Sequence, residues 1–458
     1  MFSSNFSLLL VLILILISQS ADTKTTHSPP SQSHLSIPLY RRDMLAIKKN
    51  NLDYKTLVNS YEGSLFHTSV YNQLGGEYVA YFWVGSPPQR VGFLIDTGSR
   101  LMWLQCLPCE ECYNQTEGPI FDPAQSSSYE EIECNSSTQC HNGEYLIEHC
   151  NGYDYEGIST NNSTTAEEQC RYQYSYADGE TTDGRMIKEK LTFIMDQEAV
   201  ENIVMGCSDS FGGNYSGKYA GILGLNHGPY SILDQLGVTN FSFCLPNPSF
   251  KDLTTLDFFY PGPRNTSETV ITPFMIPRFE KSNQYYVSFS GISINDILLP
   301  IPSSYWHRSS SSGNGDDNGV LIDSGSSLTW FPKEVYTIFR DSFAKFTSKA
   351  LYQLEHPAEI PVTFDICFRR HPFEGTTDID VHSPIVKFHF ISNSMFTASS
   401  ITLTTSQLFL DMDNNTYCLA FASSSYNFTI IGSHQLQGTR LTFDLYHNNL
   451  ILSPNDCS

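Results

Sequence analysis

The chain has 458 residues, enough for one large two-lobed unit or for two domains with sizeable cores. Aromatic residues make up 13% of it and charged residues 16%, a composition that excludes an intrinsically disordered protein. The formal net charge of −22 argues against a nucleic-acid partner, because proteins bind phosphates with Lys and Arg.

The first 21 residues resemble a secretory signal peptide. An apolar run, LLLVLILILI from Leu8 to Ile17, precedes small polar residues, and we expect cleavage near Ser20 or Ala21. The alternative is a membrane anchor, but the run is too short to span a bilayer comfortably. No later segment is apolar enough to span one, so the sequence predicts an exported protein without a membrane anchor.

Residues 22–75 form a leader whose charge differs from the rest of the chain. The leader carries six Lys and Arg against four Asp and Glu, whereas the remainder has 20 basic and 44 acidic residues. A basic leader on an acidic body predicts a prosegment that docks electrostatically. The alternative is a disordered tail without a function of its own.

From residue 76 onward the pattern is that of a β protein. Segments such as EYVAYFWVG and QYYVSFSGISIND are rich in β-branched and aromatic residues and end near turn residues. The clearest helix signal is FPKEVYTIFRDSFAKF, which Pro332 opens. Its apolar side chains repeat with helical period and predict a stripe that packs on the core: Val335, Ile338, Phe339, Phe343 and Phe346.

One strand-and-turn segment occurs twice. Residues 93–104 read FLIDTGSRLMWL and residues 320–331 read VLIDSGSSLTWF, with seven of twelve positions identical. GILGL follows the first copy and TIIGS follows the second. The doubling predicts an all-β, bilobal fold with a cleft between an N-terminal lobe, residues 76–270, and a C-terminal lobe, residues 271–458.

Each copy places an aspartate, Asp96 or Asp323, at the end of an apolar strand. Gly98 and Gly325 let the backbone turn sharply there. Neighbouring hydroxyls are expected to hold the two carboxylates: Thr97, Ser99, Ser324 and Ser326. Two carboxyls within hydrogen-bond reach share a proton, so one acts as an acid and the other as a base. Such a pair can activate water and protonate a carbonyl group without a metal or another cofactor.

The chain has twelve cysteines, of which seven lie between Cys106 and Cys170. A zinc site is the alternative, because CLPCEEC contains CxxC, but the region lacks a second CxxC and HxxxH. In an exported protein we favour disulfides, and we expect no metal site. Nine Asn-X-Ser/Thr sequences predict glycosylation, at Asn114, Asn135, Asn161, Asn162, Asn214, Asn240, Asn265, Asn414 and Asn427.

From about residue 76 to its end, the chain resembles the pepsin-type aspartic proteases, and most closely the secreted plant, nepenthesin-like branch. The resemblance rests on the two tetrads at Asp96 and Asp323 and on the hydrophobic-hydrophobic-Gly segments at residues 222–224 and 430–432. It implies a secreted aspartic endopeptidase with a zymogen leader, catalytic aspartates Asp96 and Asp323, protein or peptide substrates, and no cofactor. The expected location is the extracellular space, the apoplast, with the vacuole as the alternative, and we expect a monomer.

The same resemblance assigns further residues. A β-hairpin flap over the bound peptide corresponds to YSYADGETTDG, with its tyrosine at Tyr176 and with Ala177 where the relatives usually have glycine. Trp103 corresponds to the tryptophan that hydrogen-bonds this tyrosine; simple strand and core packing is the alternative for both residues. The implied disulfides are Cys106–Cys109, Cys112–Cys207, Cys134–Cys170, Cys140–Cys150, Cys244–Cys457 and Cys367–Cys418, although spacing alone does not select this pairing.

A different class of function shares this fold. Pepsin-fold binding proteins, such as plant inhibitors of microbial glycan hydrolases, keep the architecture but commonly lack one aspartate or its loop. This chain keeps both tetrads, which favours the enzyme. A storage protein has little support because Gln- or Asn-rich tracts are absent, and a serine hydrolase has less because no GxSxG sequence occurs.

Overall fold

All described residues belong to one compact unit of the computed structural model, Leu35–Ser458. The described residues are 35–41, 78–115, 118–133, 146–150, 169–194, 197–213, 219–228, 230–245, 254–259, 268–275, 284–308, 318–347, 351–354, 364–370, 383–392, 399–412 and 416–457. The predicted signal peptide, most of the leader, Cys134 and Cys140 lie outside these ranges.

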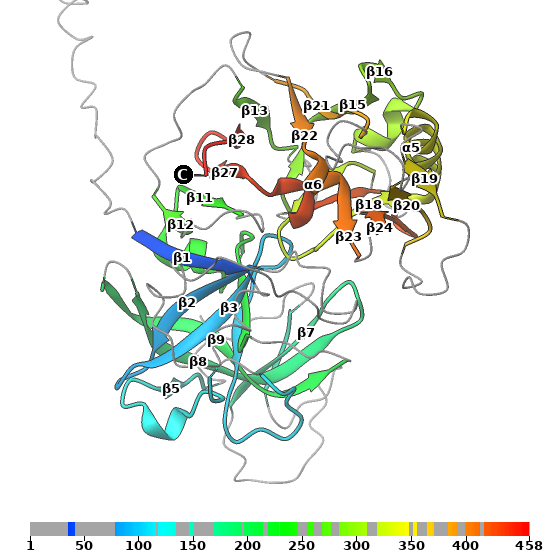
Figure 1. Cartoon of the computed structure of the whole chain (residues 1–458). Helices are drawn as coiled ribbons and strands as arrows, with labels where there is room; N and C mark the ends of the chain where they lie inside the picture. Colours follow the sequence, from blue (N-terminus) through cyan, green and yellow to red (C-terminus); the bar gives the residue numbers. More distant parts are fainter. Residues whose placement is uncertain are drawn as a thin grey trace, which may run out of the picture. The chain divides into compact units, whose positions relative to one another are not determined.

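The predicted all-β architecture is confirmed, and its largest sheet has 15 described strands (Figure 1). In hydrogen-bonded order, fourteen of them are β13 (Val270–Pro273), β28 (Asn449–Pro454), β27 (Thr439–Asp444), β11 (Asn240–Cys244), β12 (Thr254–Phe258), β1 (Leu35–Arg41), β2 (Tyr78–Val84), β3 (Gln89–Asp96), β10 (Gly221–Gly224), β4 (Met102–Gln105), β9 (Ala199–Gly212), β8 (Thr181–Phe193), β7 (Cys170–Ser175) and β6 (Leu146–Cys150). The fifteenth strand, β5 (Glu130–Glu131), pairs with β8 outside this order.

The second half of the chain adds three smaller sheets, whose strands range from light green to orange in Figure 1. The first runs β14 (Tyr286–Val287), β17 (Val320–Asp323), β26 (Thr429–Gly432), β18 (Thr329–Pro332), β25 (Phe421–Ser424). The second runs β16 (Ile297–Leu298), β15 (Phe289–Ile294), β21 (Val386–Phe390), β22 (Ser400–Leu403). The third runs β19 (Leu351–Gln353), β20 (Cys367–Arg370), β24 (Thr416–Leu419), β23 (Phe409–Asp411).

Helices are few and short among the described residues. They are α4 (Ile232–Leu236), α5 (Lys333–Phe346) and α6 (Thr405–Leu408), with the 3₁₀ turns η3 (Pro123–Gln125), η4 (Ser303–Trp306) and η6 (Ser433–Leu436). Helix α5 is the predicted one and begins directly after Pro332. Val335, Phe339 and Phe343 are buried as expected, and Tyr336 joins them. Ile338 and Phe346 are only partly buried against the same core.

The doubling seen in the sequence is a doubling of topology. In the first half, β10 runs parallel to β3, so that Gly224 lies beside Asp96, and antiparallel to β4. In the second half, β26 runs parallel to β17, so that Gly432 lies beside Asp323, and antiparallel to β18. Each hydrophobic-hydrophobic-Gly segment therefore threads between the aspartate strand and the strand that follows it.

Strands from the two halves of the chain share the large sheet. The C-terminal strands β27 and β28, red in Figure 1, lie beside the green strands β11 and β13. A disulfide between Cys244 and Cys457 joins the end of β11 to the end of the chain. The leader contributes β1, which pairs with β12 on one side and with β2 on the other.

The pairing of Cys106, Cys109, Cys112 and Cys207 differs from the one the resemblance implied. The structure joins Cys106 to Cys207 and Cys109 to Cys112. The reason is the parallel pairing of β4 with β9, which sets Leu104 opposite Cys207 and carries Cys106 to within 5.4 Å of Cys207, Cα to Cα. A partner cysteine 101 residues away, on another strand, cannot be identified from cysteine spacing.

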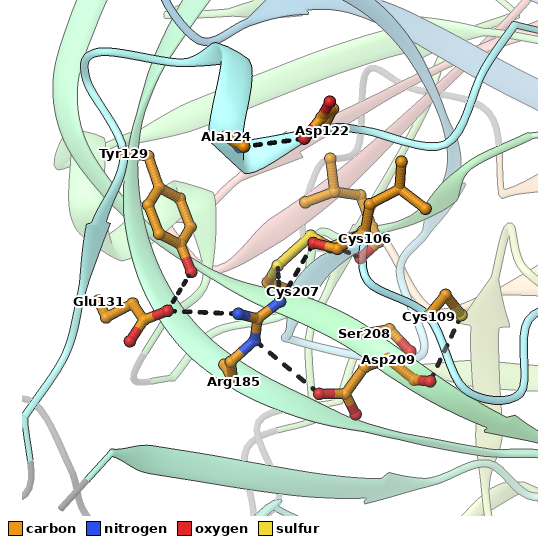
Figure 2. The surroundings of a disulfide bond; sticks show 12 residues. Cys106, Cys109, Asp122, Ala124, Tyr129, Glu131, Arg185, Cys207, Ser208 and Asp209 are labelled. Atoms are coloured by element: carbon orange, nitrogen blue, oxygen red, sulfur yellow. Dashed lines mark hydrogen bonds and ion pairs between the residues drawn. A yellow bond between two sulfur atoms is a disulfide. The ribbon is translucent and has the colours of Figure 1, made fainter. Parts of the chain in front are cut away.

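Charged groups surround the Cys106–Cys207 disulfide (Figure 2). The Arg185 guanidinium lies 3.7 Å from the Cys207 Sγ atom and 3.3 Å from the Glu131 carboxylate. Its Nε atom lies 3.8 Å from Asp209, and the Tyr129 hydroxyl donates to Glu131 at 2.8 Å. These contacts connect β5, β8 and β9 around the bond.

Two of the other implied disulfides lie among the described residues, whereas Cys134–Cys170 and Cys140–Cys150 do not. Cys244–Cys457 and Cys367–Cys418 are confirmed. Cys170 is disulfide-bonded, but its expected partner Cys134 lies outside the described residues.

Three of the nine predicted glycosylation asparagines lie among the described residues. Asn114 and Asn427 are exposed, whereas Asn240 is half-buried within β11. The other six lie outside the described ranges: Asn135, Asn161, Asn162, Asn214, Asn265 and Asn414.

Proteolysis at Glu110 and Glu111 tests the disulfide pairing, because it separates Cys112 from the peptide that holds Cys106 and Cys109. With the pairing in the structure, this peptide stays linked to both the Cys112 peptide and the Cys207 peptide, a cluster of three. The pairing implied by the resemblance would instead release the Cys106–Cys109 peptide from a Cys112–Cys207 pair. The measurement is non-reducing peptide mass mapping at acid pH, where thiol exchange is suppressed.

Candidate active site

Asp96 and Asp323 end the paired strands β3 and β17, and each carboxylate is held by its own loop. The Gly98 amide donates to Asp96 Oδ1 at 2.8 Å, and the Gly325 amide donates to Asp323 Oδ1 at 2.9 Å. The Ser326 hydroxyl donates to Asp323 Oδ2 at 2.7 Å. These bonds leave the remaining faces of the two carboxyls for each other.

Thr97 and Ser324 have a different role from the one expected for them. The Thr97 hydroxyl accepts from the Ser324 amide at 3.0 Å and donates to the Ile322 carbonyl at 3.1 Å. Reciprocally, the Ser324 hydroxyl accepts from the Thr97 amide and donates to the Ile95 carbonyl, both at 3.1 Å. Both side chains are fully buried. They therefore bind the two aspartate loops to each other rather than binding the carboxylates.

The two glycines of the tetrads allow this close approach. A methyl group on Gly98 would lie 2.8 Å from Asp323 Oδ1, and one on Gly325 would overlap the Asp96 carboxylate. Each glycine thus faces the carboxyl group of the opposite loop. Neither glycine has a positive φ, so the motif needs glycine here for space between the loops and not for the turn that the sequence suggested.

The two carboxyls form a coupled acid pair. Asp96 is 6% exposed, and burial, the negative charge of Asp323 and a hydrogen bond with Asp323 raise the pKa of Asp96 well above its usual range. The nearby Ser99 hydroxyl and Gly98 amide act in the opposite direction but do not outweigh these effects. Because two adjacent carboxylates cannot both remain charged at low cost, the pair retains one proton between them.

The predicted flap is the hairpin of β7 and β8, and we use the name for its tip, residues 175–181. At the tip, the Tyr176 hydroxyl accepts a hydrogen bond of 2.6 Å from Trp103 Nε1. Trp103 is 1% exposed and stacks on Phe211, so it both packs in the core and holds the tyrosine. Burial, together with the smaller effects of Tyr174 and Asp96, raises the pKa of Tyr176 well above its usual value.

Ala177 fits the flap turn without strain. The Tyr176 carbonyl accepts from the Gly179 amide at 3.1 Å, and the Tyr176 amide donates to the Glu180 carbonyl at 2.8 Å. Gly179 takes the left-handed conformation, with φ of +90°, whereas Ala177 is not among the residues with positive φ. A glycine is therefore required at position 179 of this hairpin, and alanine is tolerated two residues earlier.

Two tyrosines of the second half reach this region without any sequence motif to identify them. The buried Tyr285 hydroxyl donates at 2.7 Å to the carbonyl of Leu225, the residue after Gly224. The Tyr426 hydroxyl donates at 3.0 Å to the carbonyl of Ala177 in the flap. Both partners are backbone carbonyls, which side-chain patterns cannot reveal.

The exchange between Thr97 and Ser324 predicts a large stability effect for Thr97→Val. Valine leaves the Ser324 amide and the Ile322 carbonyl buried without partners, and we expect a loss of about 2–4 kcal/mol in the free energy of unfolding. Thr97→Ser keeps the hydroxyl and is the matched control. Urea unfolding followed by tryptophan fluorescence measures both, and a Thr97→Val protein within about 0.5 kcal/mol of wild type would contradict this role.

The raised pKa of Asp96 predicts a pH-dependent effect of Asp96→Asn. A carboxyl whose folded pKa is raised contributes stability below its unfolded pKa, near 4, and this stability is lost as pH rises toward the folded value. Asparagine does not ionise, so the variant does not lose this stability as the pH rises. It should be more stable than wild type near pH 7, by roughly 1–3 kcal/mol, and equally stable near pH 3. Thermal unfolding of both proteins at both pH values is the measurement. A stability difference between variant and wild type that is the same at the two pH values would refute the raised pKa of Asp96.

Both halves of the chain match known protein families. The family described as "Xylanase inhibitor N-terminal" matches residues 78–255, and "Xylanase inhibitor C-terminal" matches residues 284–454. Among solved structures, basic 7S globulin from soybean superposes with a TM-score of 0.63 at 16% identity, covering 93% of this chain and 97% of the globulin. This likeness shows the pepsin-like fold.

Curated relatives are closer in sequence. "Aspartic proteinase nepenthesin-1" from Nepenthes gracilis is 32% identical over 398 residues, covering 85% of this chain and 80% of the relative. "Aspartyl protease family protein 2" from Arabidopsis thaliana is also 32% identical, covering 84% of this chain and 72% of the relative. With these similarities and two aspartate loops built on one doubled topology, the chain belongs to the plant nepenthesin-like family of aspartic proteases.

Proposed function

We propose that this protein is a secreted aspartic endopeptidase that hydrolyses peptide bonds of protein substrates in acid. The observation that carries the proposal is the placement of the buried Asp96 beside Asp323, where burial and the Asp323 charge raise the pKa of Asp96. A pair that keeps one proton contains a general acid and a general base at the same pH.

The geometry supports a reaction without a covalent intermediate. Water between the carboxyls transfers a proton to the charged member and attacks the peptide carbonyl, while the protonated member donates to the carbonyl oxygen. The loop amides of Gly98 and Gly325 and the Ser326 hydroxyl fix the orientation of both carboxyls. Tyr176 and Trp103 lie on the flap side of the pair, where they help exclude bulk water.

The fold by itself does not decide between catalysis and binding. The matching families carry the words "xylanase inhibitor", and a superposing structure is a seed globulin. What favours catalysis in this chain is that both tetrads are complete and brought together. A binding protein has no need for two loops whose glycines each make room for the other loop's carboxyl.

The leader and the exported location belong to the same proposal. We expect residues 1–21 to direct export to the apoplast or vacuole and residues 22–75 to act as a prosegment, cleaved in acid. The described residues include no helix long and apolar enough to cross a membrane.

Asp96→Asn and Asp323→Asn should each reduce peptide hydrolysis to background while the protein remains folded, because one carboxyl cannot serve as both acid and base. The assay is cleavage of denatured globin at acid pH by the activated protein, with circular dichroism to verify folding. Ser406→Ala, on the exposed start of α6, is a matched control that keeps both carboxyls. Near-normal turnover by either asparagine variant would eliminate the mechanism.

The pH profile is expected to be bell-shaped, with a maximum between about pH 2.5 and 5. On the acid side both carboxyls become protonated and the base is lost. On the alkaline side the shared proton is lost, and because the pKa of Asp96 is raised, this limb lies above the titration range of ordinary carboxyls. kcat/KM on a peptide substrate measures the profile, and an optimum at pH 7 or above would be incompatible with it.

A further inference from the structure

The tip of the flap is hydrogen-bonded to the other half of the molecule. The Tyr426 hydroxyl donates to the Ala177 carbonyl at 3.0 Å across a sequence separation of 249 residues. Tyr426 lies in the turn between β25 and β26, and β26 carries the glycine that pairs with the Asp323 strand. The contact therefore links the flap to the sheet that presents the second aspartate.

A row of aromatic rings anchors Tyr426 on that sheet. Its ring stacks on Phe428 with centroids 5.1 Å apart, and Phe428 packs edge-on against Tyr286 at 6.1 Å. Tyr286 is buried, pairs with Leu321 in β17, and lies under the Arg308 guanidinium. Stacking on Phe428 already orients the Tyr426 side chain, so its hydrogen bond to the flap costs little additional side-chain entropy.

The flap is thereby held at two points. Trp103 holds Tyr176 from the first half, and Tyr426 holds the next residue, Ala177, from the second half. Ala177 itself is exposed, as is the turn that follows it. Tyr426 is 39% exposed, whereas Trp103 is buried. Of the two residues that hold the flap, Tyr426 is therefore the one that solvent reaches.

We propose that Tyr426 is a positioning residue that tethers the flap tip across the acid pair and thereby controls substrate entry. The proposal rests on the peptidase function proposed above. Tyr426 links the flap to the sheet that contains the Asp323 strand, and Trp103 links it to the sheet that contains the Asp96 strand, so the chain closes on itself through these contacts. An internal segment of a long polypeptide has no free end to thread through such a loop, so the tether has to open for each protein substrate.

The strength of the hydrogen bond between Tyr426 and Ala177 sets the expected change in flap opening. A single hydrogen bond between uncharged groups shifts an opening equilibrium by about 2- to 10-fold. Where a ligand binds only the open form, its apparent association rate rises in proportion to the open fraction. Tyr426→Phe keeps the ring stack and removes only the hydroxyl, so it should raise that fraction by about the same factor.

The experiment compares wild type with Tyr426→Phe and with Tyr446→Phe. Tyr446 is 75% exposed, lies in the turn between β27 and β28, and packs edge-on against His447, which makes it a control for loss of a surface phenol. The association rate of pepstatin, an uncleaved peptide inhibitor, is measured by surface plasmon resonance at acid pH. Deuterium exchange of peptides spanning residues 170–193 is measured in the absence of inhibitor.

We expect Tyr426→Phe to bind pepstatin about 2- to 10-fold faster and to exchange faster in the flap. Tyr446→Phe should match wild type in both measurements. An unchanged or slower association rate for Tyr426→Phe would overturn the proposal. If wild type neither cleaves peptides nor binds pepstatin, the peptidase function fails, and flap exchange alone decides the tether: faster exchange supports it and unchanged exchange overturns it.

Discussion

The reciprocal exchange of hydrogen bonds between Thr97 and Ser324 is the constraint on which the site depends. Each hydroxyl satisfies an amide of the opposite loop and a carbonyl of the opposite strand, with all of these groups buried. An unpaired backbone group in such a place is costly, so the two loops can only be displaced together. The exchange fixes the separation of the carboxyls, and glycine on both loops makes that separation attainable. The relative positions of the two carboxyls are therefore fixed by the backbone of this protein and do not depend on the side chains of the substrate.

Short separation has an electrostatic cost that the surrounding fold has to sustain. The burial and charge that raise the pKa of Asp96 disfavour the doubly ionised pair, and the Ser99 hydroxyl and the Gly98 amide only partly offset this. The surrounding framework compensates through strands that both halves contribute to one sheet and through the Cys244–Cys457 disulfide at its end. The scaffold thus supplies the stability that offsets the electrostatic cost of placing the two carboxyls together.

Local patterns predicted much of this arrangement, and the contacts between distant segments account for most of what they missed. The repeated tetrads, the β texture and helix α5 were readable because strand alternation, turn glycines and helical period are local signals. The roles of Thr97 and Ser324 were assigned to the wrong partners, because a hydroxyl next to a carboxylate in sequence need not face it in space. The Cys106 pairing and the Tyr426 contact likewise depend on which strand lies beside which, and no spacing within the sequence encodes that.

The position of β1 in the sheet determines what a proteolytic cut between residues 42 and 77 would produce. Leu39 and Arg41 pair with Ala80 and Tyr78, so the two ends of the connection from residue 42 to residue 77 are neighbours in the sheet. A cut anywhere in that connection severs the covalent link but leaves β1 hydrogen-bonded to both β2 and β12. Loss of the strand would uncover two sheet edges at once, which are sites for aggregation. If the proposed prosegment is cut within that connection, the product is a two-chain protein in which residues 35–41 stay paired in the sheet.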